Sequence, residues 1–186
     1  MRHGTNGTEL LRTGIAVFGG GEPGPGDPLY EQAREIGSLL AARGVPVVTG
    51  GYGGVMEAAS RGAREAGGEA FGVPCARFRG RSPNRWLTRV LEEPDLLART
   101  RRLFELSRGF IVLAGKAGTL AELAMLWALL RAGLLAAPVV ILDATWGRMY
   151  EDLDRAGRLD PAVRQWTRFA ASPAEAVRLA LGEEPR

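Results

Sequence analysis

Short apolar runs alternate along the chain with longer segments in which apolar residues recur every three or four positions. The short runs are rich in Val, Ile and Phe, which is typical of buried strands, whereas the recurring spacing places apolar side chains on one face of a helix. We expect strands at residues 14–18, 45–49, 69–74, 110–114, 137–143 and 167–170. We expect helices at residues 28–43, 55–66, 96–107, 120–130, 146–156 and 173–181. This alternation predicts an α/β fold with a mostly parallel central sheet covered by helices on both faces.

One domain accounts for most of the 186 residues. We place it at residues 14–182, with a flexible N-terminal tail at 1–13 and a short C-terminal tail at 183–186. The N-terminal tail is polar, so we expect no signal peptide there. Residues 75–89 form a long arginine-rich loop, and long loops in compact domains are often lids.

Composition narrows the chemistry that is available. The only cysteine is Cys75 and the only histidine is His3, which excludes intrachain disulfides, cysteine metal clusters, histidine metal sites and Ser-His-Asp triads. We therefore predict no metal and no cofactor, and chemistry based on carboxylates, arginines, hydroxyls and backbone groups. No apolar run approaches the roughly 18 residues of a membrane span, and we expect a cytoplasmic protein.

Glycine-containing turns follow three of the predicted strands. Gly20 lies in the first turn, Gly50 and Gly51 open the second, and the third begins at Gly115. Because the carboxyl ends of parallel strands meet at one edge of a sheet, these turns can converge on one ligand site.

The third turn carries the strongest signal. It links an apolar strand to an apolar helix, an arrangement that directs backbone N–H groups and the positive helix end toward an anion. Gly115, Gly118 and Thr119 belong to this turn, which predicts a phosphate-binding loop. Lys116 is the only lysine of the chain. Lys116 either contacts a phosphate group or lies in this turn by chance.

Two charged residues lie on otherwise apolar helical stripes. Glu122 is the only charge between Ala117 and Leu130, and it is either a partner of the helix dipole or a functional group. Arg99 shares a helix face with Leu103, so it needs a buried anion such as Glu122 or a ligand phosphate unless it extends outward to water.

Two of the glycine turns resemble the motifs of a known family. Residues 115–122 resemble the PGGxGTxxE signature of the LONELY GUY (LOG) family, and residues 50–57 resemble its second glycine motif. Arg99 falls where that family has a catalytic arginine. The resemblance extends over residues 14–181 and implies a Rossmann-like three-layer sandwich.

The LOG family hydrolyses the N-glycosidic bond of nucleoside 5′-monophosphates and releases a free base and ribose 5-phosphate. By position, the resemblance implies that Glu122 and Arg99 are catalytic. A carboxylate beside the ribose can stabilise the oxocarbenium-like transition state, and the arginine can keep it ionised. The candidates for phosphate and nucleotide contact are Gly20, Gly50, Gly51, Met56, Gly115, Lys116, Gly118 and Thr119.

Two residues depart from the signature. Ala114 and Lys116 stand where the LOG family has a proline and a glycine. If that glycine position requires a positive φ, Lys116 is strained or the loop is reshaped. The sequence also resembles molybdenum-cofactor carrier proteins, which bind a phosphorylated pterin without turnover. Two functions therefore stay open: a phosphoribohydrolase, and a non-catalytic carrier of a phosphorylated ligand.

Two interactions with macromolecules complete the expectations. The helix at residues 120–130 is apolar on every side, and a homodimer interface would cover it. The arginines of residues 75–89 are compatible with binding of single-stranded nucleic acid, but only two aromatic residues, Phe78 and Trp86, accompany them. We favour a solvated loop that steers phosphate-bearing ligands.

Overall fold

A computed structural model describes residues 11–183 and contains a seven-stranded sheet in which every pairing is parallel. The strands are β1 (Gly14–Phe18), β2 (Val47–Thr49), β3 (Ala70–Gly72), β4 (Arg89–Val90), β5 (Ser107–Val112), β6 (Val139–Ile141) and β7 (Thr167–Phe169). The helices are α1 (Pro28–Ala41), α2 (Val55–Glu65), α3 (Leu96–Leu106), α4 (Ala117–Arg131), α5 (Ala144–Arg155), α6 (Pro161–Trp166) and α7 (Pro173–Ala180). The α/β Rossmann-like prediction is confirmed.

The strand order β4-β3-β2-β1-β5-β6-β7 reverses direction between β1 and β5. Ligands of open parallel sheets bind outside the carboxyl ends of the strands at such a switch point. The loops after β1 and β5 lie side by side there, since the Gly20 N–H donates to the Ala114 carbonyl at 2.8 Å.

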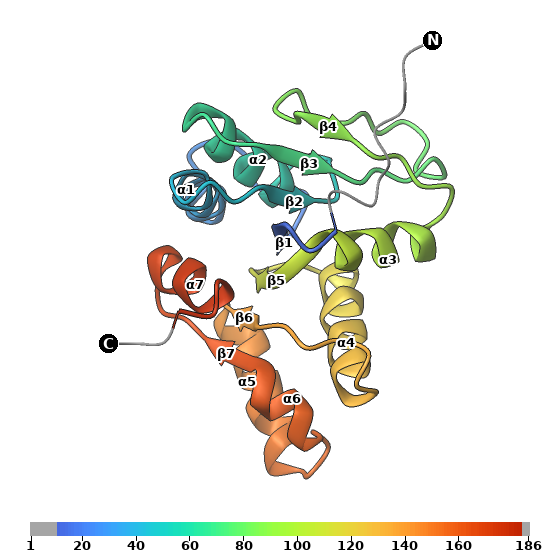
Figure 1. The fold of residues 1–186 in the computed structure, drawn as a ribbon, viewed down its shortest axis with the longest axis vertical. Helices are drawn as coiled ribbons and strands as arrows, with labels where there is room; N and C mark the ends of the chain where they lie inside the picture. Colours follow the sequence, from blue (N-terminus) through green and yellow to red (C-terminus); the bar gives the residue numbers. More distant parts are fainter. Residues whose placement is uncertain (1–10, 184–186) are drawn as a thin grey trace.

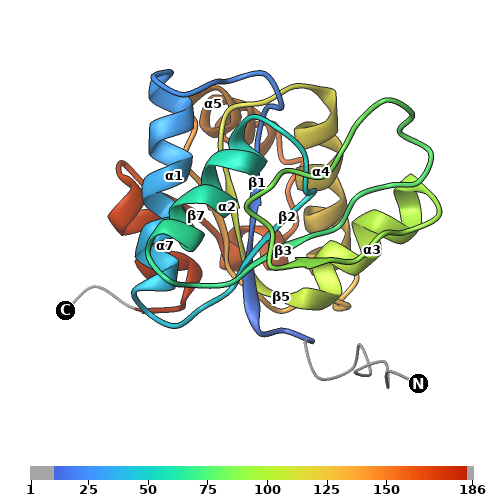
Figure 2. The same cartoon turned by 90° about the horizontal axis from the view of Figure 1, so that it is seen from above.

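Two apolar cores lie on opposite faces of the sheet. Successive side chains of β1 alternate between them: Ile15 and Val17 pack with α1, α2 and α7, whereas Ala16 and Phe18 pack toward α3, α4, α5 and α6. The two groups of helices are separated by the strands in Figures 1 and 2. The sheet is therefore covered on both faces, as a parallel sheet requires.

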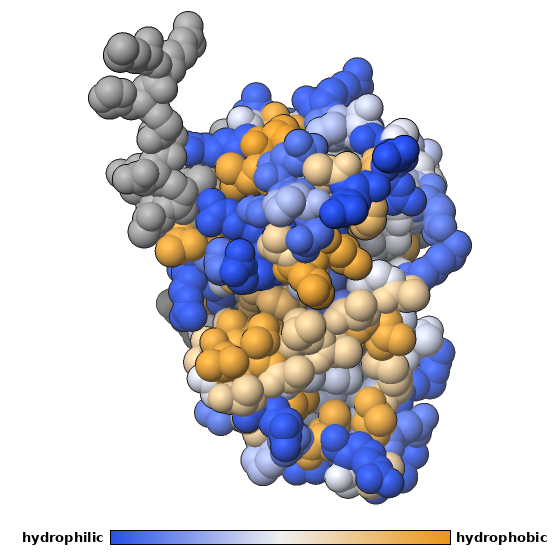
Figure 3. All heavy atoms as spheres, turned by 90° about the vertical axis from the view of Figure 1, so that its right-hand side faces the viewer, coloured by the Kyte–Doolittle hydropathy of each residue, from blue (hydrophilic) through white to orange (hydrophobic). Residues whose placement is uncertain are grey.

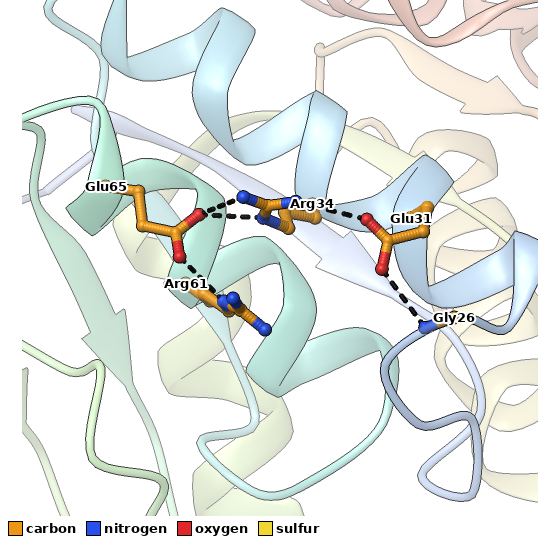
Figure 4. Close-up of polar contacts among 5 residues, drawn as sticks. All are labelled: Gly26, Glu31, Arg34, Arg61 and Glu65. Atoms are coloured by element: carbon orange, nitrogen blue, oxygen red, sulfur yellow. Dashed lines mark hydrogen bonds and ion pairs between the residues drawn. The ribbon is translucent and has the colours of Figure 1, made fainter.

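Helices α1 and α2 approach each other closely. A Cβ atom at Gly62 would lie 1.8 Å from the Arg34 carbonyl oxygen, so only glycine allows this contact. Beside it, the Glu65 carboxylate accepts hydrogen bonds from Arg34 and Arg61, both at 2.7 Å (Figure 4). Glu31 pairs with Arg34 and accepts from the N–H of Gly26 at 3.2 Å, which ties the loop after β1 to the helix pair.

Side-chain caps fix the starts of three helices, because Asp27, Asp95 and Ser172 accept backbone N–H groups in the first turns that follow them. Helix α4 begins at Ala117, three positions before the predicted start at residue 120, and the Leu120 N–H donates to the Lys116 carbonyl.

The sequence pattern missed the short helix α6. Leu96 lies two helical turns before the buried Leu103 on α3 but is 49% exposed. None of the helices in residues 11–183 has the length and apolar character that crossing a bilayer requires.

The predicted tails are described only in part. The backbone N–H groups of Arg12 and Thr13 donate to the carbonyls of Glu105 and Leu106 at the end of α3. Residues 1–10, which include His3, and residues 184–186 lie outside the described part of the chain.

Candidate functional site

A cleft of about 400 Å³ opens at the carboxyl edge of the sheet, where the loops after β1, β2 and β5 meet α3 and α4. Most of the predicted site residues line it, namely Gly20, Gly50, Met56, Arg99, Lys116, Gly118, Thr119 and Glu122. Gly51 and Gly115 are not among the lining residues. The topology therefore brings the predicted catalytic pair and most predicted ligand contacts to one place.

Arg99 and Glu122 face each other inside the cleft. Arg99 Nη1 lies 3.5 Å from Glu122 Oε1, and the two side chains are only 9% and 13% exposed. Arg99 Nε also donates to the Val73 carbonyl at 2.9 Å, which fixes the guanidinium from the opposite side. The partner that the sequence required for a buried Arg99 is therefore present.

Burial dominates the electrostatics of Glu122. Loss of solvation raises the pKa of this carboxyl from 4.5 to about 7, although Arg99 opposes the rise through its charge and its hydrogen bond. The expectation that Arg99 keeps the carboxylate fully ionised is thus too strong, because at neutral pH the protonated and ionised forms are both populated.

Gly50 makes room for the arginine. A Cβ atom at this position would lie 1.7 Å from Arg99 Nη2 and 2.9 Å from the sulfur of Met56. The glycine after β2 therefore allows the guanidinium to lie against the backbone. Gly51 has a φ of +84° and packs against Gly72 instead of the cleft.

Gly115 contributes to the site by leaving room for the side chain of Thr119. A Cβ atom at residue 115 would lie 2.2 Å from Thr119 Oγ1, so glycine is needed for Thr119 to reach its place. Thr119 is 4% exposed and lines the cleft from the first turn of α4. Thr119 lines the same cleft as Arg99 and Glu122, and a hydroxyl at the start of a helix suits an anionic ligand group.

Lys116 has an ordinary backbone conformation, with φ of −113° and ψ of −156°, so the strain considered from the sequence does not occur. Its Nζ lies 2.6 Å from Glu22 Oε1, and both side chains are largely exposed. The pair joins the loop after β5 to the loop after β1 at the mouth of the cleft.

Sequence reasoning missed several lining residues, namely Glu22, Tyr52, Phe78, Arg81, Leu97, Thr100 and Met125. Most of them lie near predicted site residues in the sequence, whereas Phe78 and Arg81 come from the loop between β3 and β4. The arginine-rich loop gave a signal for Arg81, but nothing local distinguished it from the other arginines there. Asp143, which follows β6, caps α5 by accepting the N–H groups of Thr145 and Trp146. Within residues 11–183, no three His, Cys, Asp or Glu side chains gather as a metal site would require.

Comparison with known proteins agrees with this fold. Residues 12–156 match the pattern of the SLOG cluster4 family. The chain belongs to the SLOG cluster4 family. The chain is also similar to LOG-like proteins with a Rossmann-like fold.

The chain is 30% identical over 131 residues to a probable cytokinin riboside 5′-monophosphate phosphoribohydrolase of Oryza sativa subsp. japonica. The aligned region covers 69% of this chain and 58% of the rice protein. The chain spans 34–58% of the length of curated relatives that it matches.

Solved structures of similar fold include the molybdenum cofactor carrier protein of Chlamydomonas reinhardtii, with a TM-score of 0.71 and 25% identity over 92% of this chain and 98% of that one. The molybdenum cofactor binding protein of Rippkaea orientalis has a TM-score of 0.70 and 24% identity over 92% and 96% of the two chains, a likeness of fold alone.

Proposed function

We propose that this protein is a nucleoside 5′-monophosphate phosphoribohydrolase. The observation that carries the proposal is the Arg99–Glu122 pair, which faces the same cleft as Gly118 and Thr119. The turn and the first residues of α4 bind the 5′-phosphate, and the ribose lies beside Glu122. The similarity to the rice phosphoribohydrolase supports this assignment.

The reaction uses Glu122 in its ionised form. Water attacks C1′ of the ribose, the bond from C1′ to the base nitrogen breaks, and its electron pair leaves with the base. The carboxylate stabilises the positive charge that develops on the ribose and accepts the proton of the attacking water, and this proton then passes to the nitrogen of the departing base, which restores the carboxylate. Arg99 lowers the pKa of Glu122 toward neutrality, against the effect of burial.

The test is release of free base from AMP and the other common nucleoside monophosphates, followed by chromatography. We expect Glu122→Gln and Arg99→Met each to reduce release about 100-fold or more, because Glu122 acts on the reacting atoms and Arg99 holds it in its ionised form. Glu105→Gln is the matched control, since Glu105 is exposed on α3. A wild-type protein that leaves every nucleotide intact contradicts the proposal.

A non-catalytic carrier is the second candidate. It is favoured by the carrier protein of Chlamydomonas reinhardtii, whose structure matches along nearly its whole length, whereas the match to the rice enzyme covers 58% of that protein. A carrier retains a phosphorylated ligand through purification and releases no product. Native mass spectrometry of the purified protein, combined with the base-release assay, separates the two functions.

We also propose a homodimer that covers α4. The helix buries Leu123 and Leu126, but Leu120, Ala124 and Met125 are exposed on its other side, with no charge except Glu122 between residues 117 and 130. Figure 3 shows apolar side chains gathered in a band across this face of the molecule. Exposed apolar patches of this kind often mark protein interfaces.

Light scattering during gel filtration tests the dimer. Ala124→Glu places a charge on the exposed side of α4 and is expected to yield monomers, whereas Ala144→Glu, at an exposed alanine of α5, leaves the dimer intact. A wild-type protein that is monomeric at micromolar concentration contradicts this proposal.

A further inference from the structure

The loop between β3 and β4 is fastened to the cleft at two points. The Tyr52 hydroxyl accepts the N–H of Cys75 at 2.8 Å and donates to its carbonyl at 3.2 Å. Farther along the loop, Asn84 donates its backbone N–H to the Gly51 carbonyl at 2.8 Å and its side-chain amide to the Tyr52 carbonyl at 3.0 Å. These bonds hold the intervening residues beside the glycine turn that follows β2.

Arg81 lies in the part of the loop between those two points. Its guanidinium carbon is 5.8 Å from the ring centre of Tyr52 and 5.8 Å from that of Phe78. No carboxylate of residues 11–183 forms an ion pair with it, unlike Arg99, which pairs with Glu122. A guanidinium that lies over aromatic rings keeps its N–H donors in the plane of the group, where they can bind an anion.

Arg81 lines two adjoining hollows. One is the cleft with Arg99 and Glu122, and the other is a hollow of about 410 Å³ that also contains Gly53 and Ser82. The two share a common wall formed by Gly21, Glu22, Tyr52, Met56 and Arg81. The space that a ligand can occupy therefore extends past the nucleotide cleft toward Arg81.

We infer that Arg81 forms a second anion subsite, which binds a phosphate group separate from the one at Gly118 and Thr119. The inference rests on the proposed function and deepens it, because it names the ligand class as a nucleotide with two separated phosphate groups. Glu22 also lines the subsite, but its carboxylate is paired with Lys116 at 2.6 Å, which offsets its repulsion of an anion.

Phe78 connects the two subsites. Its ring contacts Arg81 and also lies 6.0 Å from the guanidinium carbon of Arg99. A ligand that bridges the subsites therefore spans both arginines across one aromatic side chain. Arg77, Arg79 and Arg81 are all exposed, but only Arg81 lines the two hollows.

Isothermal titration with AMP and with adenosine 3′,5′-bisphosphate tests the subsite. We expect the wild-type protein to bind the bisphosphate about tenfold more tightly than AMP, since a charge-assisted contact is added. Arg81→Gln is expected to remove this tenfold gain, because it weakens binding of the bisphosphate about tenfold more than it weakens binding of AMP. Arg79→Gln, which removes the same charge from the same loop, retains the gain.

The outcomes separate the two proposals. If AMP binds but the bisphosphate binds no more tightly, or if Arg81→Gln weakens both ligands equally, the second subsite is wrong and the proposed function stands. If Arg79→Gln and Arg81→Gln remove the gain equally, general attraction by the loop replaces the subsite. If neither nucleotide binds, nucleotide binding itself fails, and the subsite fails with it.

Discussion

Arg34 and Glu65 meet on the outer surface of α1 and α2, whereas Arg99 and Glu122 meet inside the cleft. The outer pair has a separation of 2.6 Å and is solvated, and hydrogen bonds from Arg61 and Arg34 hold the pKa of Glu65 below its usual value. The inner pair has a separation of 3.5 Å, and burial raises the pKa of Glu122 to about 7. The same two functional groups thus form a solvated ion pair on the surface and a desolvated pair in the cleft, where burial raises the pKa of the carboxyl group.

The largest effect is expected from removing the inner arginine. Arg99→Met leaves Glu122 buried without its cation and Val73 without its donor, which should destabilise the protein by about 3–5 kcal/mol at pH 8. Urea denaturation measures the change. Arg101→Met is the control on the same helix, because Arg101 is exposed and makes only a 3.7 Å contact with Glu105; equal losses for the two variants would contradict the comparison.

Removing the inner carboxylate should instead increase the free energy of unfolding at high pH. Because the folded-state pKa of Glu122 lies above the unfolded value of 4.5, the folded protein binds this proton more tightly, so wild-type stability falls as pH rises from about 4.5 to about 7. Glu122→Gln escapes this loss and should be more stable than wild type at pH 8, by about 3 kcal/mol at most, and equal to it near pH 4. Thermal melts of both proteins across pH provide the measurement, and a pH-independent difference would refute the raised pKa.

A smaller effect is expected from crowding the inner pair. Gly50→Ala places a methyl group against Arg99 and should cost about 1–3 kcal/mol while displacing the guanidinium from Glu122. Gly53→Ala is the matched control in the same loop, since its methyl group would lie 3.6 Å from the nearest atom. Denaturation and nucleotide affinity should both separate the two variants, and identical behaviour would show that Gly50 does not position Arg99.

The smallest effect is expected at the outer pair. Arg34→Met should change stability by about 1 kcal/mol at most, because solvent screens exposed ion pairs. Its effect should shrink further in 1 M salt, whereas that of Arg99→Met persists. Denaturation at low and high salt checks this, and a large salt-resistant loss for Arg34→Met would erase the distinction between the two regions.

The pattern of the sequence predicted six of the seven strands and six of the seven helices of the described chain, because strand runs and helical spacing are local signals. The buried face of α1, which includes Tyr30, Ile36 and Leu40, was predictable from helical spacing alone. The charged positions Arg99 and Glu122 were also visible, since each interrupts an apolar stripe. Local signals therefore located the two charges that meet in the cleft.

Other features depend on contacts between distant segments. Neither the pairing of Lys116 with Glu22 nor the place of Arg81 over Tyr52 follows from any local pattern. The direction of the Glu122 pKa shift likewise required the balance between burial and one cation, which only the packed structure supplies. The short helix α6 was missed because six residues carry too little periodicity.

The hydrogen bond from the Gly20 N–H to the Ala114 carbonyl joins two loops that are far apart along the chain. Neither half of the polypeptide contains a complete cleft, since Gly20 and Gly50 come from one and Glu122 from the other. A fragment that stops before β5 would leave one side of β1 without its neighbour and would have no carboxylate for the arginine. Ligand binding therefore depends on the pairing of β1 with β5. A ligand that binds the complete cleft stabilises this pairing in turn.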